Sequence, residues 1–124
     1  MQLLTEAIKA KLDATPIYTH DGAKPEDVPV IVKFFDPAGR FTYYVTECEQ
    51  YQDGNINRMR FFGFCVSPLG KDCDELGYMD FEEIQNAFSN RILPLERDIH
   101  FEGTLKDAYE SAGYKKHLPI SEWN

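Results

Sequence analysis

The chain has 124 residues, of which 43% are hydrophobic, and this is enough for one core without disulfide or metal support. Its formal net charge is -8, from 13 basic and 21 acidic residues. Binding to duplex DNA through phosphates requires a basic surface, so this charge argues against it and favours a partner protein with a basic surface. We expect a single domain over residues 1–124.

The three cysteines, Cys48, Cys65 and Cys73, are odd in number and lack the spacing of a metal site. Cys65 lies in an apolar run, which favours a buried thiol. The N-terminus lacks the basic and apolar regions of a signal peptide, and no apolar stretch reaches membrane-spanning length. We therefore expect a cytoplasmic protein without a bound metal or cofactor.

The first predicted element is a short helix over Thr5–Asp13, because Leu4, Ile8 and Leu12 recur at helical spacing. Thr5 is suited to cap its N-terminus. The following segment, residues 15–29, is rich in proline and has little periodicity, so we expect a loop there.

Strands are predicted next, in three segments rich in β-branched and aromatic residues: Val30–Phe35, Phe41–Thr46 and Arg60–Val66. Asp36–Gly39 has the composition of a type I turn, and Asp53-Gly54 is a strong hairpin signal. These turns predict an antiparallel meander, to which Leu76–Met79 adds a short fourth strand.

Two further helices follow this sheet in the sequence. Asp80 and Glu83 have the spacing of a capping box at the start of one helix. Thr104 is suited to cap the last helix, and Gly113 to end it. The predicted fold class is α+β: an antiparallel meander of about four strands with three short helices packed on one face.

Several segments together resemble the bacterial family of domains of unknown function 2958 (DUF2958), from the first residues to about Phe101. The most specific of them are Glu75-Leu76-Gly77-Tyr78 and Glu96-Arg97-Asp98-Ile99-His100-Phe101. The others are Leu3-Leu4-Thr5, Val32-Lys33-Phe34-Phe35-Asp36-Pro37, Tyr44-Val45-Thr46-Glu47, Phe61-Phe62-Gly63 and Leu93-Pro94-Leu95. The resemblance implies a small protein of bacteria and their mobile elements, often encoded near DNA-handling genes. It implies no activity.

The segment Leu93–Phe101 holds the candidate catalytic residues. If it is a strand, Glu96, Asp98 and His100 share one face, where carboxylates and an imidazole suit metal binding or acid–base chemistry. The alternative is structural: Arg97 pairs with a carboxylate, and Asp98 accepts hydrogen bonds from turn amides.

An acidic run that includes Asp72, Asp74 and Glu75 is a candidate surface for a basic partner, and we add Tyr78 and Arg97 as candidate binding residues. The alternative is a solvated loop followed by carboxylates that favour the positive end of a helix.

Aromatic residues of the predicted strands suggest a surface on which single-stranded bases stack. The rings are Tyr43, Tyr44, Phe61, Phe62 and Phe64, and the neighbouring cations are Lys33, Arg58 and Arg60. The alternative is that the rings are core residues, because one face of the sheet must be buried.

Three functional hypotheses remain, and the nucleophile, phosphate-loop and HExxH metal motifs of common enzymes are absent from the sequence. The first is a non-enzymatic accessory protein that binds another protein, with DNA-handling proteins among the candidate partners. The second is a small metal-dependent enzyme built on Glu96, Asp98 and His100. The third is a weak single-strand binder.

Overall fold

The computed structural model describes residues 2–39, 41–69, 74–88 and 93–114. In this part of the chain the helices are α1 (Glu6–Asp13), the short 3-10 helix η1 (Pro25–Asp27), α2 (Phe81–Phe88) and α3 (Leu105–Ser111). The strands are β1 (Val32–Phe35), β2 (Thr42–Asp53), β3 (Ile56–Val66), β4 (Glu75–Asp80) and β5 (Glu96–Arg97).

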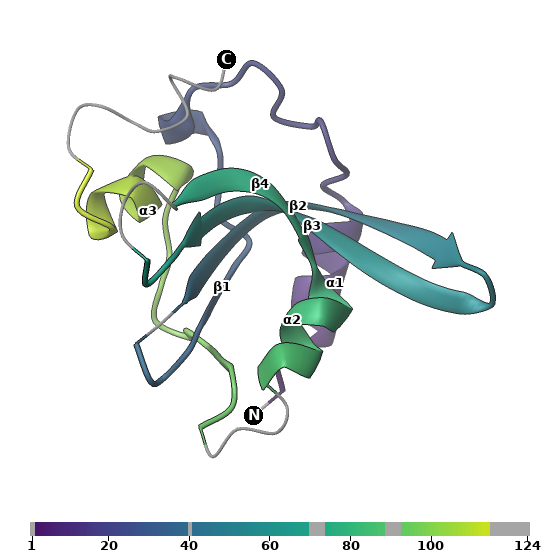
Figure 1. Ribbon diagram of the computed structural model, residues 1–124. Helices are drawn as coiled ribbons and strands as arrows, with labels where there is room; N and C mark the ends of the chain where they lie inside the picture. The colour runs from purple at the N-terminus through teal and green to yellow at the C-terminus, as the bar shows by residue number, and fades with distance from the viewer. Residues whose placement is uncertain (1, 40, 70–73, 89–92, 115–124) are drawn as a thin grey trace.

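The strands form one antiparallel sheet in the order β4-β3-β2-β1-β5 (Figure 1). The predicted meander is confirmed, and so is the α+β fold class, with five strands where about four were expected. The fifth strand, β5, is very short and pairs Arg97 with Phe34 and Glu96 with Phe35.

Both predicted turns are confirmed. Gly39 donates its backbone N–H to the carbonyl of Asp36 at 2.8 Å, which closes the turn between β1 and β2. At the end of the β2–β3 hairpin, Asp53 pairs with Ile56, and Gly54 has a φ of +63°. A glycine with positive φ at the first central position is typical of a type II′ turn, whose twist matches that of paired strands.

The β2–β3 hairpin is longer than the sequence predicted, because its strands continue to the turn. β1 pairs with the first part of β2 only, Thr42–Val45, and β4 pairs with Arg60–Cys65 of β3. The far end of the hairpin therefore projects as a two-stranded arm, at the right of Figure 1.

Hydrophobic side chains cover both faces of the sheet, because neighbouring strand residues point to opposite faces. On the first face, α1 and α2 pack on a cluster that includes Val45 and Phe61. On the second face, α3 packs on a cluster that includes Tyr44 and Phe64. The expectation that all helices lie on one face is therefore wrong. Figure 1 shows α1 and α2 below the sheet and α3 at its left.

The predicted helix caps are present. The Thr5 hydroxyl accepts a hydrogen bond from the Ile8 N–H at 3.2 Å. Thr104 forms a capping box with Asp107, and Gly113 follows α3 with a φ of +92°. Asp80 accepts from the N–H of Glu83 at 3.1 Å, so the first half of the predicted capping box of α2 is confirmed.

In the described segments, no helix has the length and apolar character needed to cross a membrane.

Candidate functional site

A hollow on the second face of the sheet, next to the cluster under α3, is the candidate functional site. It has a volume of about 610 Å³ and lies between the loop that follows α1 and the middle of the sheet. The loop contributes Ile17, Tyr18, His20, Asp21, Gly22 and Ala23, and the sheet contributes Glu47, Phe62, Leu76 and Tyr78.

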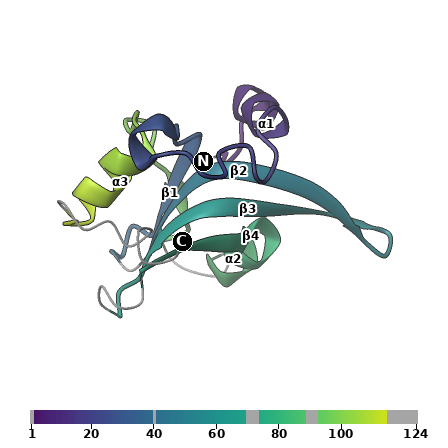
Figure 2. The ribbon, with the colours of Figure 1, turned by 90° about the horizontal axis from the view of Figure 1, so that it is seen from above.

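The sheet positions the loop because β1 is so short. Beyond Val45, β2 lacks β1 as a neighbour, and the Cys48 N–H donates instead to the carbonyl of Thr15 at 3.0 Å. The chain between α1 and η1 passes over this edge and reaches the second face, as the dark blue segment in Figure 1 and in the view from above in Figure 2 shows. A segment that the sequence identified only as a proline-rich loop thereby becomes one wall of the site.

Glu47 ties this wall to the sheet. Its side chain is buried, and its carboxylate accepts hydrogen bonds from the backbone N–H groups of Tyr18, at 2.8 Å, and His20, at 3.0 Å. These charge-assisted bonds compensate in part for removing the carboxylate from water. A β-bulge between Val45 and Glu47 places Glu47 opposite Phe62, on the face that forms the hollow.

Tyr18 has strained backbone geometry. Its φ is +75°, a left-handed conformation that costs a residue with a side chain about 1–2 kcal/mol. The hydrogen bond from its N–H to Glu47 holds this conformation. Strain of this kind persists where surrounding contacts enforce it, and it concentrates at functional sites.

Two tyrosine side chains at the rim of the hollow are exposed to solvent. Tyr18 is 70% exposed and Tyr78 is 52% exposed. Their hydroxyl groups lie 3.4 Å apart, and this hydrogen bond raises the pKa of Tyr78 above its ordinary value, with smaller contributions from burial and from Glu49. Tyr78 therefore remains neutral at physiological pH, and the exposed rings of Tyr18 and Tyr78 both offer a π surface to a ligand.

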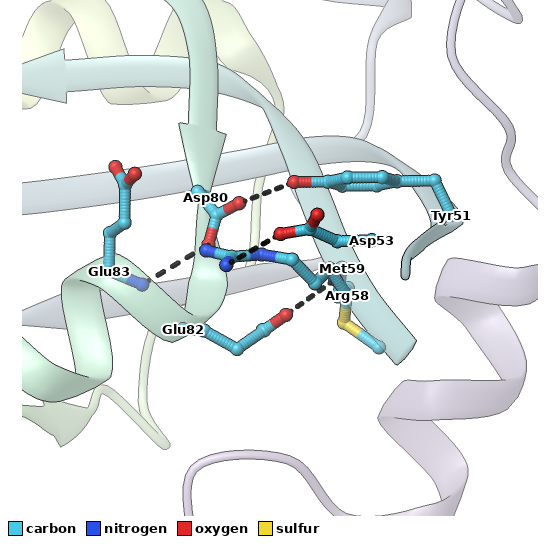
Figure 3. A network of polar contacts seen from close by, with 7 residues as sticks. All are labelled: Tyr51, Asp53, Arg58, Met59, Asp80, Glu82 and Glu83. Carbon is cyan, nitrogen blue, oxygen red and sulfur yellow. Dashed lines mark hydrogen bonds and ion pairs between the residues drawn. The ribbon is translucent and has the colours of Figure 1, made fainter. Parts of the chain in front are cut away.

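Next to the hollow, polar side chains form a network where β3, β4 and α2 meet (Figure 3). Asp80 accepts hydrogen bonds from Arg58 at 3.0 Å and from the Tyr51 hydroxyl at 2.8 Å. Burial alone would raise the pKa of Asp80, but these bonds and the Glu83 N–H lower it. Glu82 accepts from the Met59 N–H at 2.8 Å, so α2 is attached to β3 as well.

The candidate catalytic residues of the segment Leu93–Phe101 are not assembled into one site. The strand ends at Arg97, so the expected shared face of Glu96, Asp98 and His100 is not formed. Glu96 borders a hollow between α1 and α2, whereas Asp98 borders a smaller one beside β1. Within the described segments, no three histidine, cysteine, aspartate or glutamate side chains are grouped so as to hold a metal ion.

Asp98 has the structural contacts of the alternative interpretation. It accepts hydrogen bonds from the N–H groups of His100 at 2.9 Å and Phe101 at 3.1 Å, and it pairs with Lys33 at 3.0 Å. Burial opposes the charge on Asp98, but Lys33 and the two amides lower its pKa. Arg97 donates to the Gln2 carbonyl at 2.7 Å, which joins β5 to the N-terminal segment.

The candidate binding residues separate into different environments. Asp72 lies outside the described residues, as does Cys73. Asp74 is buried, accepting from the Ser67 N–H at 2.7 Å and the Tyr114 hydroxyl at 2.9 Å, so it does not belong to an acidic surface. Glu75 is exposed at the start of β4, on which Tyr78 borders the hollow.

The aromatic set proposed for base stacking is largely core. Tyr43 and Phe61 belong to the first cluster, and Tyr44 and Phe64 to the second, all of them buried. Of the five rings, Phe62 alone is partly exposed, and it packs edge-on against Tyr78.

The two described cysteines are free thiols, Cys48 buried and Cys65 partly buried. Burial, assisted by neighbouring carboxylates, raises the pKa of each thiol to about 12. Neither thiol is therefore activated as a nucleophile near neutral pH.

The fold and the site together describe a small α+β protein with a partly covered sheet and an acidic, aromatic hollow. The chain matches the family model of DUF2958, described as a protein of unknown function, over residues 3–112, and it belongs to that family. The match extends through α3, beyond the segment from which the resemblance was inferred. A search of curated proteins gave no significant match, and neither did a search of solved structures.

Sequence reasoning identified Tyr78 as a binding candidate but missed Tyr18, His20 and Glu47 as members of one site. A usable signal was present at Glu47, an acidic residue in a segment of strand composition, two positions after the apolar Val45. The loop residues carried no such signal, because their contact with Glu47 spans more than 25 positions of the chain.

Proposed function

We propose that this protein is a non-enzymatic binding module that docks another protein on the uncovered part of its second sheet face. The observation that supports this proposal most strongly is the pair of exposed rings, Tyr18 and Tyr78, at an acidic hollow that α3 leaves uncovered. Exposed tyrosines around a buried centre are characteristic of protein interfaces, because they contribute a large contact area at a low cost in side-chain entropy.

The chemistry of this face favours a basic partner. The net charge is -8, and the hollow is bordered by Glu47 and Asp21. Arg58 and Arg60 lie on the same face, but each is paired with a carboxylate, Arg58 with Asp80 at 3.0 Å and Arg60 with Glu49 at 2.9 Å. Such a face suits a basic protein, including one that handles DNA, better than it suits a duplex phosphate backbone.

The proposal is tested by photo-crosslinking in the native host. We expect a benzoylphenylalanine at position 78 to yield one discrete protein adduct whose yield falls with added salt, because the attraction is electrostatic in part. The matched control places the probe at Ile99, which is 63% exposed and lies outside the hollow. The same adduct from both positions, or no adduct from position 78, would contradict the proposal.

A further inference from the structure

The Glu47 carboxylate is buried, only 4% exposed, yet within the described segments it has no ion pair with a lysine, arginine or histidine. Its described partners are two backbone N–H groups, from Tyr18 and His20, which stabilise the charge without neutralising it. Buried charges in proteins are ordinarily paired with an opposite charge. The hollow therefore has a fixed negative charge in its wall, and Asp21 adds a second carboxylate to the lining.

The other lining groups favour a cation as the ligand that meets this charge. Tyr18, Phe62 and Tyr78 contribute aromatic rings, whose faces attract lysine and arginine side chains. The described lining contains no lysine or arginine that already fills this role. A volume of about 610 Å³ exceeds the size of one side chain and leaves room for the adjoining backbone of a bound segment.

An arginine of the same chain already shows this combination of contacts on the neighbouring strands. The guanidinium of Arg60 lies 4.8 Å from the centre of the Tyr51 ring and 5.7 Å from that of Tyr78. It also pairs with Glu49 at 2.9 Å. Ring and carboxylate together thus hold a guanidinium beside the hollow. Tyr78 is shared with the hollow, which adds its own ring, Tyr18, and its own carboxylate, Glu47.

Contacts within the chain hold the wall of the site in place. Tyr18 is held in its left-handed conformation by the hydrogen bond to Glu47, and Gly22 permits a second positive φ, of +78°, in the same loop. A wall that is already in place does not lose entropy on binding, which favours affinity.

We infer that this hollow receives a lysine or arginine side chain of the partner protein, with the Glu47 carboxylate as its counter-charge and the rings of Tyr18 and Tyr78 as its walls. The inference rests on the proposed binding function and specifies the group of the partner that is recognised.

The test uses three capped pentapeptides, with arginine, lysine or citrulline between glycines, titrated into the full-length, nitrogen-15-labelled protein. Citrulline keeps the shape of arginine without the charge. The amides of Tyr18 and His20 donate to Glu47, so their NMR signals report directly on this carboxylate. We expect the arginine and lysine peptides to shift these signals and to bind about tenfold more tightly than the citrulline peptide, corresponding to about 1.4 kcal/mol.

Two variants and one control locate the binding. We expect Glu47→Gln, which keeps the shape and removes the charge, to weaken binding of the arginine peptide by about tenfold. Tyr78→Leu changes an exposed side chain, so it tests the ring even if Glu47→Gln does not fold, and we expect a severalfold loss. Ile99→Ala should leave binding unchanged.

Equal binding of the arginine and citrulline peptides would overturn the inference, and so would unchanged binding by Tyr78→Leu. Failure of all three peptides would overturn it as well. In that case a persistent adduct at position 78 would leave the proposed function standing, whereas peptide binding without that adduct would refute the proposed function and support the cation site.

Discussion

The two faces of the sheet are built from adjacent residues of the same strands, yet they differ in how completely they are covered. On the first face, α1 and α2 together bury side chains along the strands, including Val45, Phe61 and Met79. On the second face, α3 buries Tyr44 and Phe64. The rest of this face contains the hollow, which Tyr78 borders. The first face is covered by two helices, whereas the second divides into an end that α3 covers and an end that is open to solvent at Tyr78.

The sharpest test of this comparison uses two neighbouring rings, Phe61 and Phe62, which point to opposite faces. Phe61 is fully buried, so we expect Phe61→Ala to lower the free energy of unfolding by about 4 kcal/mol through the cavity that it leaves. Phe62 is partly exposed beside Tyr78, and we expect Phe62→Ala to cost about 1 kcal/mol. Urea denaturation measures both changes, and similar losses would show that the two faces are covered equally well.

A second test concerns two glycines that pair directly across β3 and β4, Gly63 and Gly77. A Cβ atom at Gly63 would lie 1.9 Å from the carbonyl oxygen of Tyr44, whereas at Gly77 it would meet no atom within 4 Å. We expect Gly63→Ala to destabilise by about 3 kcal/mol, because the strands must separate to admit the methyl group.

Gly77→Ala is the matched control, and its free energy of unfolding should stay within about 0.5 kcal/mol of that of the wild type. Thermal unfolding of the two variants side by side gives the measurement. Equal tolerance at both positions would mean that β2 and β3 do not approach as closely as the structure shows.

The smallest expected effect concerns Asp80, which joins β4 to α2 at the border between the two faces. Loss of the cap costs about 1 kcal/mol, and loss of the partly exposed ion pair with Arg58 adds at most about 1 kcal/mol, so Asp80→Ala should destabilise by about 2 kcal/mol. Glu83→Ala keeps the backbone N–H that donates to Asp80, and it should have little effect.

Acid titration tests the same residue in the wild type. Because the folded state holds the pKa of Asp80 below its ordinary value of 3.8, its contribution is present above about pH 4 and is lost as the pH falls through the lowered pKa. Asp80→Asn should therefore flatten the fall in stability as the pH is lowered below about 4. An unchanged slope would show that the carboxylate is not preferentially ionised in the folded state.

Local sequence signals were sufficient wherever the structure depends on contacts within a few residues. The turns at Asp36–Gly39 and Asp53-Gly54, the cap of α1 at Thr5 and the cap of α3 at Thr104 were all predictable, since each is defined by a short pattern. The order of the meander followed from these turns. The segment Leu93–Phe101 stops being a strand at Arg97, because Asp98 binds two amides and closes a turn, as the structural alternative for this segment expected.

Local patterns predicted the fold class, the family and the order of the meander, because hydrophobic periodicity, turn residues and caps act over a few residues. Long-range packing set the length of the hairpin, the face that each helix covers and the place where a site forms. Alternation along a strand assigns residues to two faces but does not say which helix covers them. Glu47 became part of a site only when the loop after α1 passed the free edge of β2 and brought the amides of Tyr18 and His20 to its carboxylate.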